Sequence, residues 1–333
     1  MLVRFGYVAM SVIVKNCSPS RTMTYTSFCK IDDREAAIRK LERLAEENLT
    51  NTLRLLKHNR AHHIELYRCS SKLIPLATHE ALADWNPFIA LKEPFAAIGA
   101  YANEHGMRLS FHPDHFTVLS TPREDVLHNS IRDLEHHLRM LEAMGLDARA
   151  KNNIHIGGAY GNKKAAGERF AANFKLLSEP IKQRLTLEND DKTFTAAETL
   201  DVCEQLQVPM VLDIHHHWVN HEGEQLAELW PRILKTWDSA YAQADAPADN
   251  SFPPKIHVSS PKSEKDVRGH ADYVDVKPLL AFLRDIAPYT DRLDVMIEAK
   301  KKDDALFKLM HDLAQYEGEG VSLVSPASVT IQS

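Results

Sequence analysis

The segment MVLDIHHHW, residues 210–218, contains the pattern that decides the fold. It is apolar up to Asp213, and three histidines, His215, His216 and His217, follow almost at once. A short apolar run that ends on a carboxylate is typical of a strand buried inside a parallel sheet. We therefore expect a strand over Met210–Asp213, with chemically active side chains gathered at its carboxyl end.

The same pattern recurs along the chain, because short runs rich in Val, Ile and Leu alternate with longer stretches of helical period. The other predicted strands are Val3–Val8, Ile64–Cys69, Arg108–His112, Asn153–Gly157, Arg184–Glu188, Lys255–Ser259 and Leu293–Glu298. The predicted helices are Arg34–Asn59, Glu93–Glu104, Asp125–Met144, Lys163–Leu177, Ala196–Gln205, Glu224–Trp237, Val276–Ile286 and Lys301–Gln315. Strand then helix, eight times over, predicts one α/β domain, a (β/α)8 TIM barrel. A doubly wound sheet is the alternative, although it rarely needs so many units in succession.

Composition agrees with an ordinary globular enzyme, since 44% of the 333 residues are hydrophobic and 26% are charged. The formal net charge of −6 gives no reason to expect a general affinity for nucleic acid or for anionic membranes. Four cysteines without a CxxC motif suit a reducing cytosol, so we expect a cytoplasmic protein. The apolar run at residues 4–14 is too short to span a bilayer and lacks a signal-peptide cleavage site. A membrane partner is therefore not expected.

Two segments are expected to lie outside regular structure. Residues 241–254, rich in Pro, Ala and Asp, are predicted to form a surface loop before the seventh strand. Residues 1–318 are predicted to form the barrel domain, and residues 319–333 a loosely held C-terminal tail.

Histidines and carboxylates follow six consecutive predicted strands. In a TIM barrel the carboxyl ends of the strands meet on one face, where active sites lie. One such residue is more often structural than catalytic, but chance would scatter the set over both faces of the barrel. The residues at these ends are His112, His155, Glu188, Asp213, His216, Lys255, His257, His270 (in the loop beyond) and Glu298.

Buried groups of this kind cost several kcal/mol each if they stay unpaired, and divalent ions satisfy them directly. Histidine and carboxylate ligands without thiolates favour zinc or manganese. Eight such ligands exceed the need of one ion, so we expect two or three ions with Glu188 as a bridge. Clusters of this type activate water and hold the oxygens of a phosphoryl displacement. The predicted catalytic residues are Glu188, Lys255 and Glu298.

The neighbours of the predicted ligands need separate interpretations. His216 has the spacing of a ligand beside Asp213, whereas His215 and His217 are interpreted as supporting or loop residues. Lys255 lies two residues before His257 and faces the same side of the strand. It either anchors a phosphate or, with a carboxylated side chain, binds metal.

Eight longer stretches resemble one known family. They are FGYV, LYRCSSKLIPLATH, FHPDHFTVLSTP, MLEAMG, NIHIGGAYGNK, LTLENDDKT, VSSPKSEKDVRGHADYVD and MIEAK. Together they are similar, from about Leu2 to Gly318, to the ultraviolet damage endonuclease family (UVDE/UvsE). That family is a TIM barrel of the endonuclease IV-like superfamily with three metal ions.

The resemblance implies roles for particular positions. The family's ligands fall on the eight histidines and carboxylates given above, and its modified lysine falls on Lys255. Its lesion-probing pair, Gln and an aromatic residue, falls on His115 and Phe116, and Tyr7 matches a residue of the lesion pocket. Endonuclease IV has an aspartate ligand where this chain has Arg268, so the third ion is expected to be bound differently.

The resemblance also implies an activity. The protein would cut damaged double-stranded DNA immediately 5′ of cyclobutane pyrimidine dimers and 6–4 photoproducts, leaving a 3′-hydroxyl and a 5′-phosphate. Manganese is the expected ion, with zinc, magnesium or cobalt as alternatives, and a monomer is expected because a duplex must reach the barrel face. Basic residues after the fourth and seventh strands, interpreted as phosphate contacts or as solvated charges, are Lys163, Lys164, Lys262, Lys265 and Arg268. The rival functions are an abasic-site endonuclease, a metal-dependent sugar isomerase or epimerase, and a non-enzymatic binding module.

Overall fold

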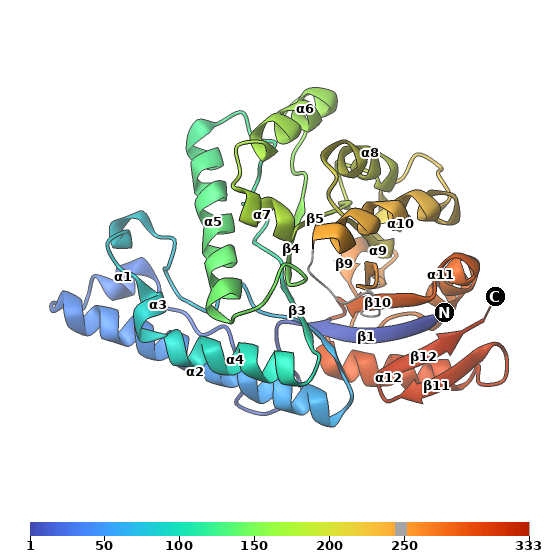
Figure 1. The fold of residues 1–333 in the computed structure, drawn as a ribbon, viewed down its shortest axis with the longest axis horizontal. Coiled ribbons are helices and arrows are strands. Elements are labelled where there is room, and N and C mark those ends of the chain that lie inside the picture. Colours follow the sequence, from blue (N-terminus) through green and yellow to red (C-terminus); the bar gives the residue numbers. More distant parts are fainter. Residues whose placement is uncertain (244–251, 333) are drawn as a thin grey trace.

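The computed structural model describes residues 1–243 and 252–332. Eight parallel strands form a closed barrel, because each pairs with the next and the last pairs with the first, from Leu2 opposite Arg292 to Tyr7 opposite Ile297. This confirms the predicted TIM barrel (Figure 1). The strands are β1 (Leu2–Val8), β2 (Leu66–Arg68), β3 (Arg108–Phe111), β4 (Lys151–His155), β5 (Leu185–Glu188), β6 (Met210–Asp213), β7 (Lys255–Val258) and β10 (Arg292–Ile297).

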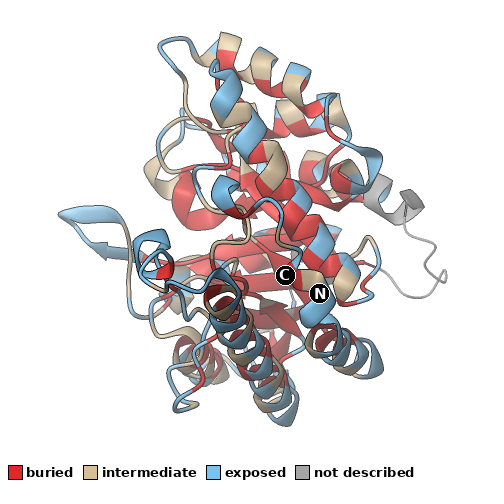
Figure 2. Cartoon of the chain, turned by 90° about the vertical axis from the view of Figure 1, so that its left-hand side faces the viewer, coloured by how far each residue is buried: buried red, intermediate tan, exposed pale blue. Residues whose placement is uncertain are grey.

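The long helices cover the outside of the barrel, with their buried sides toward the strands and their exposed sides toward solvent (Figure 2). They agree with the predicted helices to within a few residues, except that the sixth extends further at its C-terminus. They are α2 (Arg34–Ala61), α4 (Lys92–Glu104), α5 (Glu124–Ala143), α6 (Lys163–Phe174), α8 (Ala196–Leu206), α10 (Leu226–Gln243), α11 (Val276–Ile286) and α12 (Lys302–Ala314). Short helices in the connections are α1 (Tyr25–Phe28), α3 (Pro87–Ala90), α7 (Glu179–Arg184) and α9 (Ile214–Val219), with single 3-10 turns at Glu80–Leu82 and Ala287–Tyr289.

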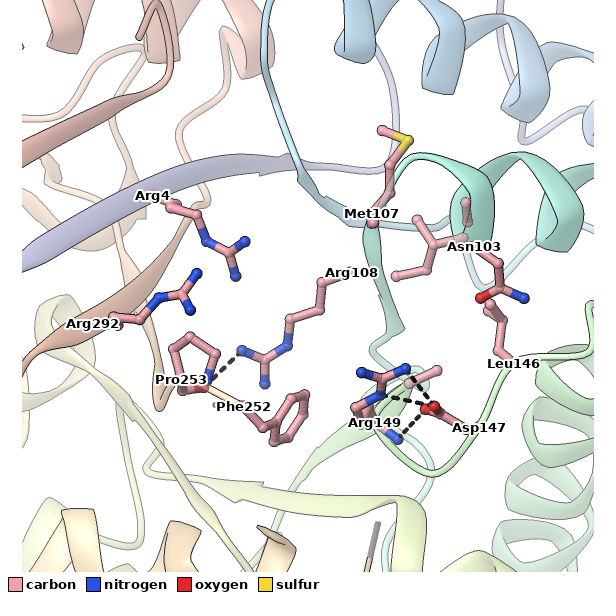
Figure 3. Close-up of a pocket in the computed structure, with 14 residues that line it drawn as sticks. Arg4, Asn103, Met107, Arg108, Leu146, Asp147, Arg149, Phe252, Pro253 and Arg292 are labelled. Atoms are coloured by element: carbon pink, nitrogen blue, oxygen red, sulfur yellow. Dashed lines mark hydrogen bonds and ion pairs between the residues drawn. The ribbon is translucent and has the colours of Figure 1, made fainter. Parts of the chain in front are cut away.

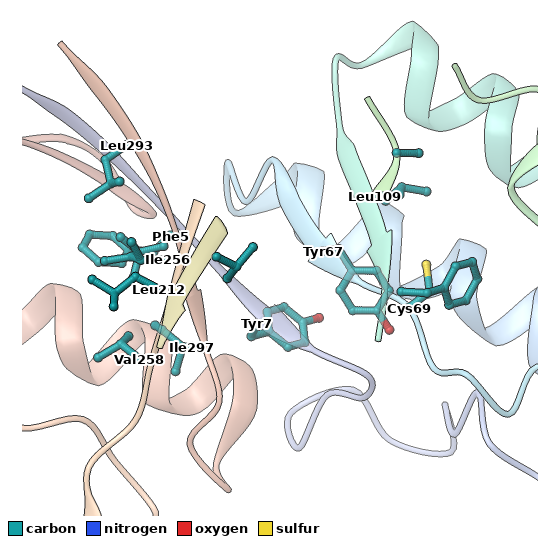
Figure 4. Packing of buried hydrophobic residues seen from close by; sticks show 14 of the residues in the cluster. Phe5, Tyr7, Tyr67, Cys69, Leu109, Leu212, Ile256, Val258, Leu293 and Ile297 are labelled. Carbon is teal, nitrogen blue, oxygen red and sulfur yellow. The ribbon is translucent and has the colours of Figure 1, made fainter. Parts of the chain in front are cut away.

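The main apolar core lies between the strands and the helices. Alternate residues of each strand point outward into this layer, including Phe5, Ile256 and Leu293 (Figure 4). The backbone of β2 lies close to Gly6, where an added Cβ would lie 2.3 Å from the backbone oxygen of Leu66. Glycine at this position therefore allows β1 and β2 to pair at their close spacing.

Charged side chains fill the lumen at the amino ends of the strands. Asp294 is fully buried and accepts from Arg4 Nε at 2.9 Å and from Arg108 Nη1 at 2.6 Å. The Arg108 guanidinium also lies over the Phe252 ring, 3.9 Å from its centroid, beside a cavity of about 220 Å³ (Figure 3). Residues at this end of a TIM barrel usually serve stability, and we assign that role to this network.

The prediction of a loosely held tail is wrong. Residues 319–333 contain a hairpin of β11 (Val321–Ser325) and β12 (Ser328–Ile331), and β12 pairs antiparallel with the first half of β1. The Met1 amino group donates to the Ile331 carbonyl at 2.8 Å, so the two ends of the chain lie side by side (Figure 1). Backbone pairing with β1 holds this segment, although it has no helical period.

Two further findings concern the connections. After β7 the chain forms an antiparallel pair, β8 (Pro261–Ser263) and β9 (Asp266–His270), that was not predicted. Of the predicted loop at 241–254, residues 244–251 lie outside the described part of the chain. Across the described ranges, no helix has the length and apolar character needed to cross a membrane.

Candidate metal centre

Glu188, at the end of β5, is the centre of the site. It is buried, and its Oε2 lies 3.2 Å from His112 Nε2 and 3.1 Å from His257 Nδ1. Its Oε1 lies 3.4 Å from His216 Nδ1. Side chains from four different strand ends therefore meet around one carboxylate, as parallel strands ending on one face predict.

The ligand atoms form two overlapping groups. One contains His112, His155 and Glu188, and the other contains Glu188, Asp213, His257 and Glu298; within each group all ligand atoms lie within 4.8 Å of one another. Glu188 belongs to both groups, which is the geometry of a bridging carboxylate. His216 and His270 lie beside them, with ring centroids 6.3 Å apart.

Backbone carbonyls fix the orientation of four histidine rings. The Nδ1 atoms of His112, His155, His216 and His270 lie 2.9, 3.2, 2.9 and 2.9 Å from the carbonyl oxygens of Pro113, Glu188, Asn189 and Glu298. Because a carbonyl only accepts, each Nδ1 is the donor, and in the neutral ring each Nε2 has its lone pair available for a metal. Histidines that bind metals are oriented in this way.

Several buried atoms at the site lack hydrogen-bond partners among the described residues. They are Glu188 Oε1, Asp213 Oδ2 and His257 Nδ1, whose close contacts with charged neighbours do not have hydrogen-bond geometry. Buried polar atoms are almost always satisfied, and divalent cations satisfy carboxylate and imidazole atoms together. The donor set therefore fits zinc or manganese.

The pKa shifts of the candidate ligands also indicate a cation site. Burial alone would raise the pKa of Glu188, but His257 and His155 hold it well below its usual range. Burial alone would lower the pKa of His257, but Glu188 and Glu298 raise it to about 9. The carboxylates thus create a strongly negative field, in which a bound cation takes the place of a proton.

Two neighbours of the ligands were missed in the sequence. Asn153 donates through Nδ2 to Glu188, and Thr186 donates to Asn153 Oδ1 at 2.7 Å, so the bridging carboxylate is held from below. Arg68, at the end of β2, pairs through Nη1 with Glu298. Asn153 could have been found, since it lies two residues before His155 and faces the same side of the strand.

Lys255 lies in the lumen beneath the ligands. Its side chain is buried, with 4% of the residue exposed, and Nζ donates to Ser110 Oγ at 3.2 Å. Burial, reinforced by the positive charge of Arg108, lowers the pKa of Lys255 well below its usual value. Burial thus favours the neutral form of the amine.

The predicted lesion-probing residues lie on the rim of the site. The Phe116 residue is 58% exposed, and the His115 side chain is 91% exposed. Both lie in the loop that leads from His112 toward α5, and neither is covered by the rest of the described chain. An exposed aromatic ring next to a metal-binding site is suited to stacking on a base.

The predicted basic contacts lie on the same face but have acidic partners. Lys163 Nζ pairs with Glu198 at 2.8 Å, Lys262 with Asp266 at 3.2 Å, and Arg268 with Asp191 at 3.7 Å. These pairs are partly exposed, so each contributes little to stability and can exchange for a phosphate.

Tyr7 does not lie in the site. Its ring has no exposed surface and packs edge-on against Tyr67, with centroids 5.4 Å apart (Figure 4). Its hydroxyl donates to Asn59 Oδ1 of α2 at 2.6 Å. The expectation that Tyr7 contacts the lesion is wrong for this structure, because Tyr7 lies on the outward face of β1 and only the alternate residues face the lumen.

Comparison with known proteins agrees with this geometry. Residues 3–331 match the family model of the UV-endonuclease UvdE. A UV DNA damage endonuclease of Halalkalibacterium halodurans is 45% identical over 330 residues, which are 99% of each chain. The crystal structure of SacUVDE superposes with a TM-score of 0.80 at 28% identity and covers 95% of this chain and 99% of that one. Endonuclease IV from Thermus thermophilus, at 14% identity, 95% and 99% coverage and a TM-score of 0.53, shares the fold. The chain belongs to the UV-endonuclease UvdE family.

Proposed function

We propose that this protein is a metal-dependent DNA repair endonuclease that cuts immediately 5′ of ultraviolet photoproducts. It would act on cyclobutane pyrimidine dimers and 6–4 photoproducts in double-stranded DNA and leave a 3′-hydroxyl and a 5′-phosphate. The observation that carries the proposal is Glu188, which bridges two ligand groups on the face where Phe116 is exposed. A sugar isomerase or a binding module needs neither the second ligand group nor the exposed ring, and the family assignment favours neither.

Each part of the chain has a distinct task in this proposal. Bound divalent ions would activate water and neutralise charge on the scissile phosphate. Glu188 and Glu298 hold the ligand groups together, and Arg68 fixes one oxygen of Glu298. Phe116 fills the space left by the extruded bases, which cost less to unstack when they are damaged. Lys163, Lys262 and Arg268 contact phosphates in exchange for their present carboxylate partners.

The experiment that tests this function is incision of supercoiled plasmid. Ultraviolet-irradiated plasmid should be nicked in the presence of manganese, and unirradiated plasmid should stay closed. Mapping the nick on a duplex with a single photoproduct should place it directly 5′ of the lesion. An abasic-site duplex run in parallel separates the rival function: faster cutting of the abasic duplex than of the photoproduct duplex would favour the endonuclease IV type of activity.

A cluster of two or three divalent ions is the expected cofactor, with manganese as the expected metal and zinc, magnesium or cobalt as alternatives. Elemental analysis of protein purified without chelators should therefore give more than one transition metal ion per chain. Removal of the ions with a chelator should abolish incision, and added manganese should restore it. A reproducible content of one ion or fewer would contradict the cluster.

Lys255 is expected to carry a carboxylated side chain that reaches the metal ions. Formation of a carbamate needs a neutral amine, and burial beside Arg108 favours that form by lowering the pKa of Lys255. A high-resolution electron-density map, from crystals grown at mildly alkaline pH with bicarbonate, should show density beyond Nζ. Lys151 is a matched control, because burial also lowers its pKa, to about 7, while its Nζ donates to the Gln183 carbonyl. The density of Lys151 should end at Nζ. A plain Lys255 amine hydrogen-bonded to Ser110 would refute the expectation.

Phe116→Ala should weaken recognition of the lesion without loss of metal. The variant should lose roughly 1–3 kcal/mol of binding, the usual worth of a base–aromatic stack. Photoproduct duplexes should be affected more than abasic ones, because two adjacent bases must be held out of the helix. The measurement is the incision rate on both duplexes, with metal content determined in parallel.

Two further variants serve as controls for Phe116. Tyr289→Ala removes another exposed aromatic ring, at the opposite end of the barrel, and should leave both rates unchanged. His115→Gln restores the common family residue and should retain activity. Parent-like incision of photoproduct DNA by Phe116→Ala would show that this loop is not the lesion probe.

We expect the enzyme to be a cytoplasmic monomer. The support for a monomer is the position of the ligands, on the one barrel face that a duplex must approach.

A further inference from the structure

Two adjacent histidines at the end of β6 have opposite protonation patterns. His216 donates through Nδ1 to the Asn189 carbonyl and keeps its Nε2 lone pair for a metal. His215 has its Nε2 2.7 Å from the Val267 carbonyl oxygen, so Nε2 must carry the proton. Its Nδ1 lies 2.6 Å from Ser259 Oγ and accepts from that hydroxyl. His215 is fully buried, and neither of its nitrogens is left to bind an ion.

The partner of His215 belongs to the β8–β9 arm, residues 261–270. Most of the arm is exposed, including Val267 on β9 (Figure 2). A two-stranded hairpin is barely stable without support from elsewhere. Arg268, next to Val267 on β9, also meets the barrel face through its pair with Asp191, whose 3.7 Å separation and partial exposure make it weak. The bond from the buried His215 ring to the Val267 carbonyl is therefore the firm tether of the middle of β9, and the bond from His270 Nδ1 to the Glu298 carbonyl holds the end of the strand.

His270 is the last residue of the same strand, three positions after Val267. Its ring lies edge-on to His215, with centroids 5.5 Å apart, and faces His216 at 6.3 Å. We propose that His215 is a positioning residue that docks the β8–β9 arm on the barrel and thereby brings His270 opposite His216 to form the third ion site. This inference rests on the proposed function only in assigning an ion to the His216–His270 pair.

The two adjacent histidines therefore have different tasks. His216 binds the ion, and His215 places the second histidine that shares it. The same tether keeps Lys262 and Arg268 on the face that binds DNA, because both belong to the arm. Neither His216 nor His270 belongs to the two ligand groups defined above, and the position of His270 depends on how well the arm is docked.

The test uses the full-length protein and the variant His215→Phe, which keeps a ring but removes both hydrogen bonds. After removal of metals and reloading, equilibrium dialysis against manganese should show one ion fewer per chain than in the parent, with the remaining ions retained. Trypsin should cut the metal-loaded variant after Lys262, Lys265 or Arg268 about tenfold faster than the parent, since cleavage follows the population of the undocked arm. The cut sites are identified by mass spectrometry.

Matched variants make the result specific. His217→Phe alters the next histidine, whose Nδ1 has no hydrogen-bond partner among the described residues, and should keep the parent's ion count and protease resistance. His215→Gln retains a donor for the Val267 carbonyl and should fall between the parent and His215→Phe. Ser259→Ala removes only the hydroxyl that bonds to His215 Nδ1. If His215→Phe does not fold, the ion count and the tryptic resistance of Ser259→Ala are measured in its place, and a partial loss of both is expected.

Three results would overturn the proposed role of His215. The proposal is overturned if His215→Phe keeps the parent's ion count and tryptic resistance, or if it loses every ion at once, because then the residue serves the whole fold. A parent protein that binds no ion at the His216–His270 pair also overturns it. Neither measurement involves DNA. Failure of the parent to nick irradiated plasmid would therefore contradict the proposed function alone.

Discussion

Replacing Glu188 by alanine is expected to abolish incision on every substrate and to release metal in the same step. Glu188 belongs to both ligand groups, so its loss opens both at once. Activation of water and neutralisation of the phosphate depend on the same ions and together contribute several kcal/mol. The rate should therefore fall by at least roughly 1,000-fold. Single-turnover incision and elemental analysis of the same preparation measure the two losses.

Glu168→Ala is the matched control, because it removes an exposed carboxylate on α6 with the same chemical change. It should leave the rate and the metal content unchanged. The loss in Glu188→Ala should be equal on photoproduct and abasic duplexes, in contrast to the selective loss in Phe116→Ala. A Glu188→Ala protein that keeps its full complement of ions would show that this residue is not a bridge.

Asp294→Asn is expected to cause the largest loss of stability. The substitution keeps the shape of the side chain but removes the carboxylate that Arg4 and Arg108 share. These residues fill the lumen at the amino ends of the strands and form the floor of the barrel. Breaking a buried ion pair costs about 3–5 kcal/mol, since a guanidinium remains buried without its counter-charge. The free energy of unfolding in urea should fall by that amount. Metal content should stay at the parent level under conditions where the variant is folded, because the floor and the ligands lie at opposite ends of the strands.

The control for this prediction is Asp312→Asn on α12. Asp312 pairs with Lys308 at 2.7 Å on the surface, where an ion pair contributes at most about 1 kcal/mol. The two variants make the same chemical change in different surroundings. Equal losses of stability would mean that the arginines of the floor find other partners and that Asp294 is not essential to the barrel.

The fold was predictable where burial dictates the residue pattern. The strand Met210–Asp213 and the helix Val276–Ile286 have the same bounds in sequence and structure, because each has one uninterrupted apolar signal. The hairpins β8–β9 and β11–β12 were missed for a physical reason. The residues of β8 and the first three of β9 are exposed, so no apolar alternation marks them. The segment after Gly318 is ordered by pairing with β1, a contact that no local pattern reveals.

The ligands of the candidate site were predictable because parallel strands deliver their last residues to one face. The supporting contacts were not. Arg68 is the last residue of β2, a strand for which no ligand was predicted, and its partner Glu298 is 230 positions away in the chain. The opposite tautomers of His215 and His216 depend on carbonyl groups whose positions exist only in the folded chain. Tyr7 was misplaced because the family match fixes the position in the sequence but not the face of the strand.

The pairing of β1 has a consequence for the order of folding. This strand leaves the ribosome before the rest of the barrel, yet β10 pairs along one of its edges and β12 along the first half of the other edge. Both are made after the other barrel strands. A ribosome that adds roughly 5–20 residues per second needs about 15–60 s to supply them. During synthesis one edge of β1 stays unpaired, and such edges recruit strands of other chains. We therefore expect newly made chains to depend on chaperones until residues 292–331 emerge, and closure of the barrel to occur after translation rather than during it.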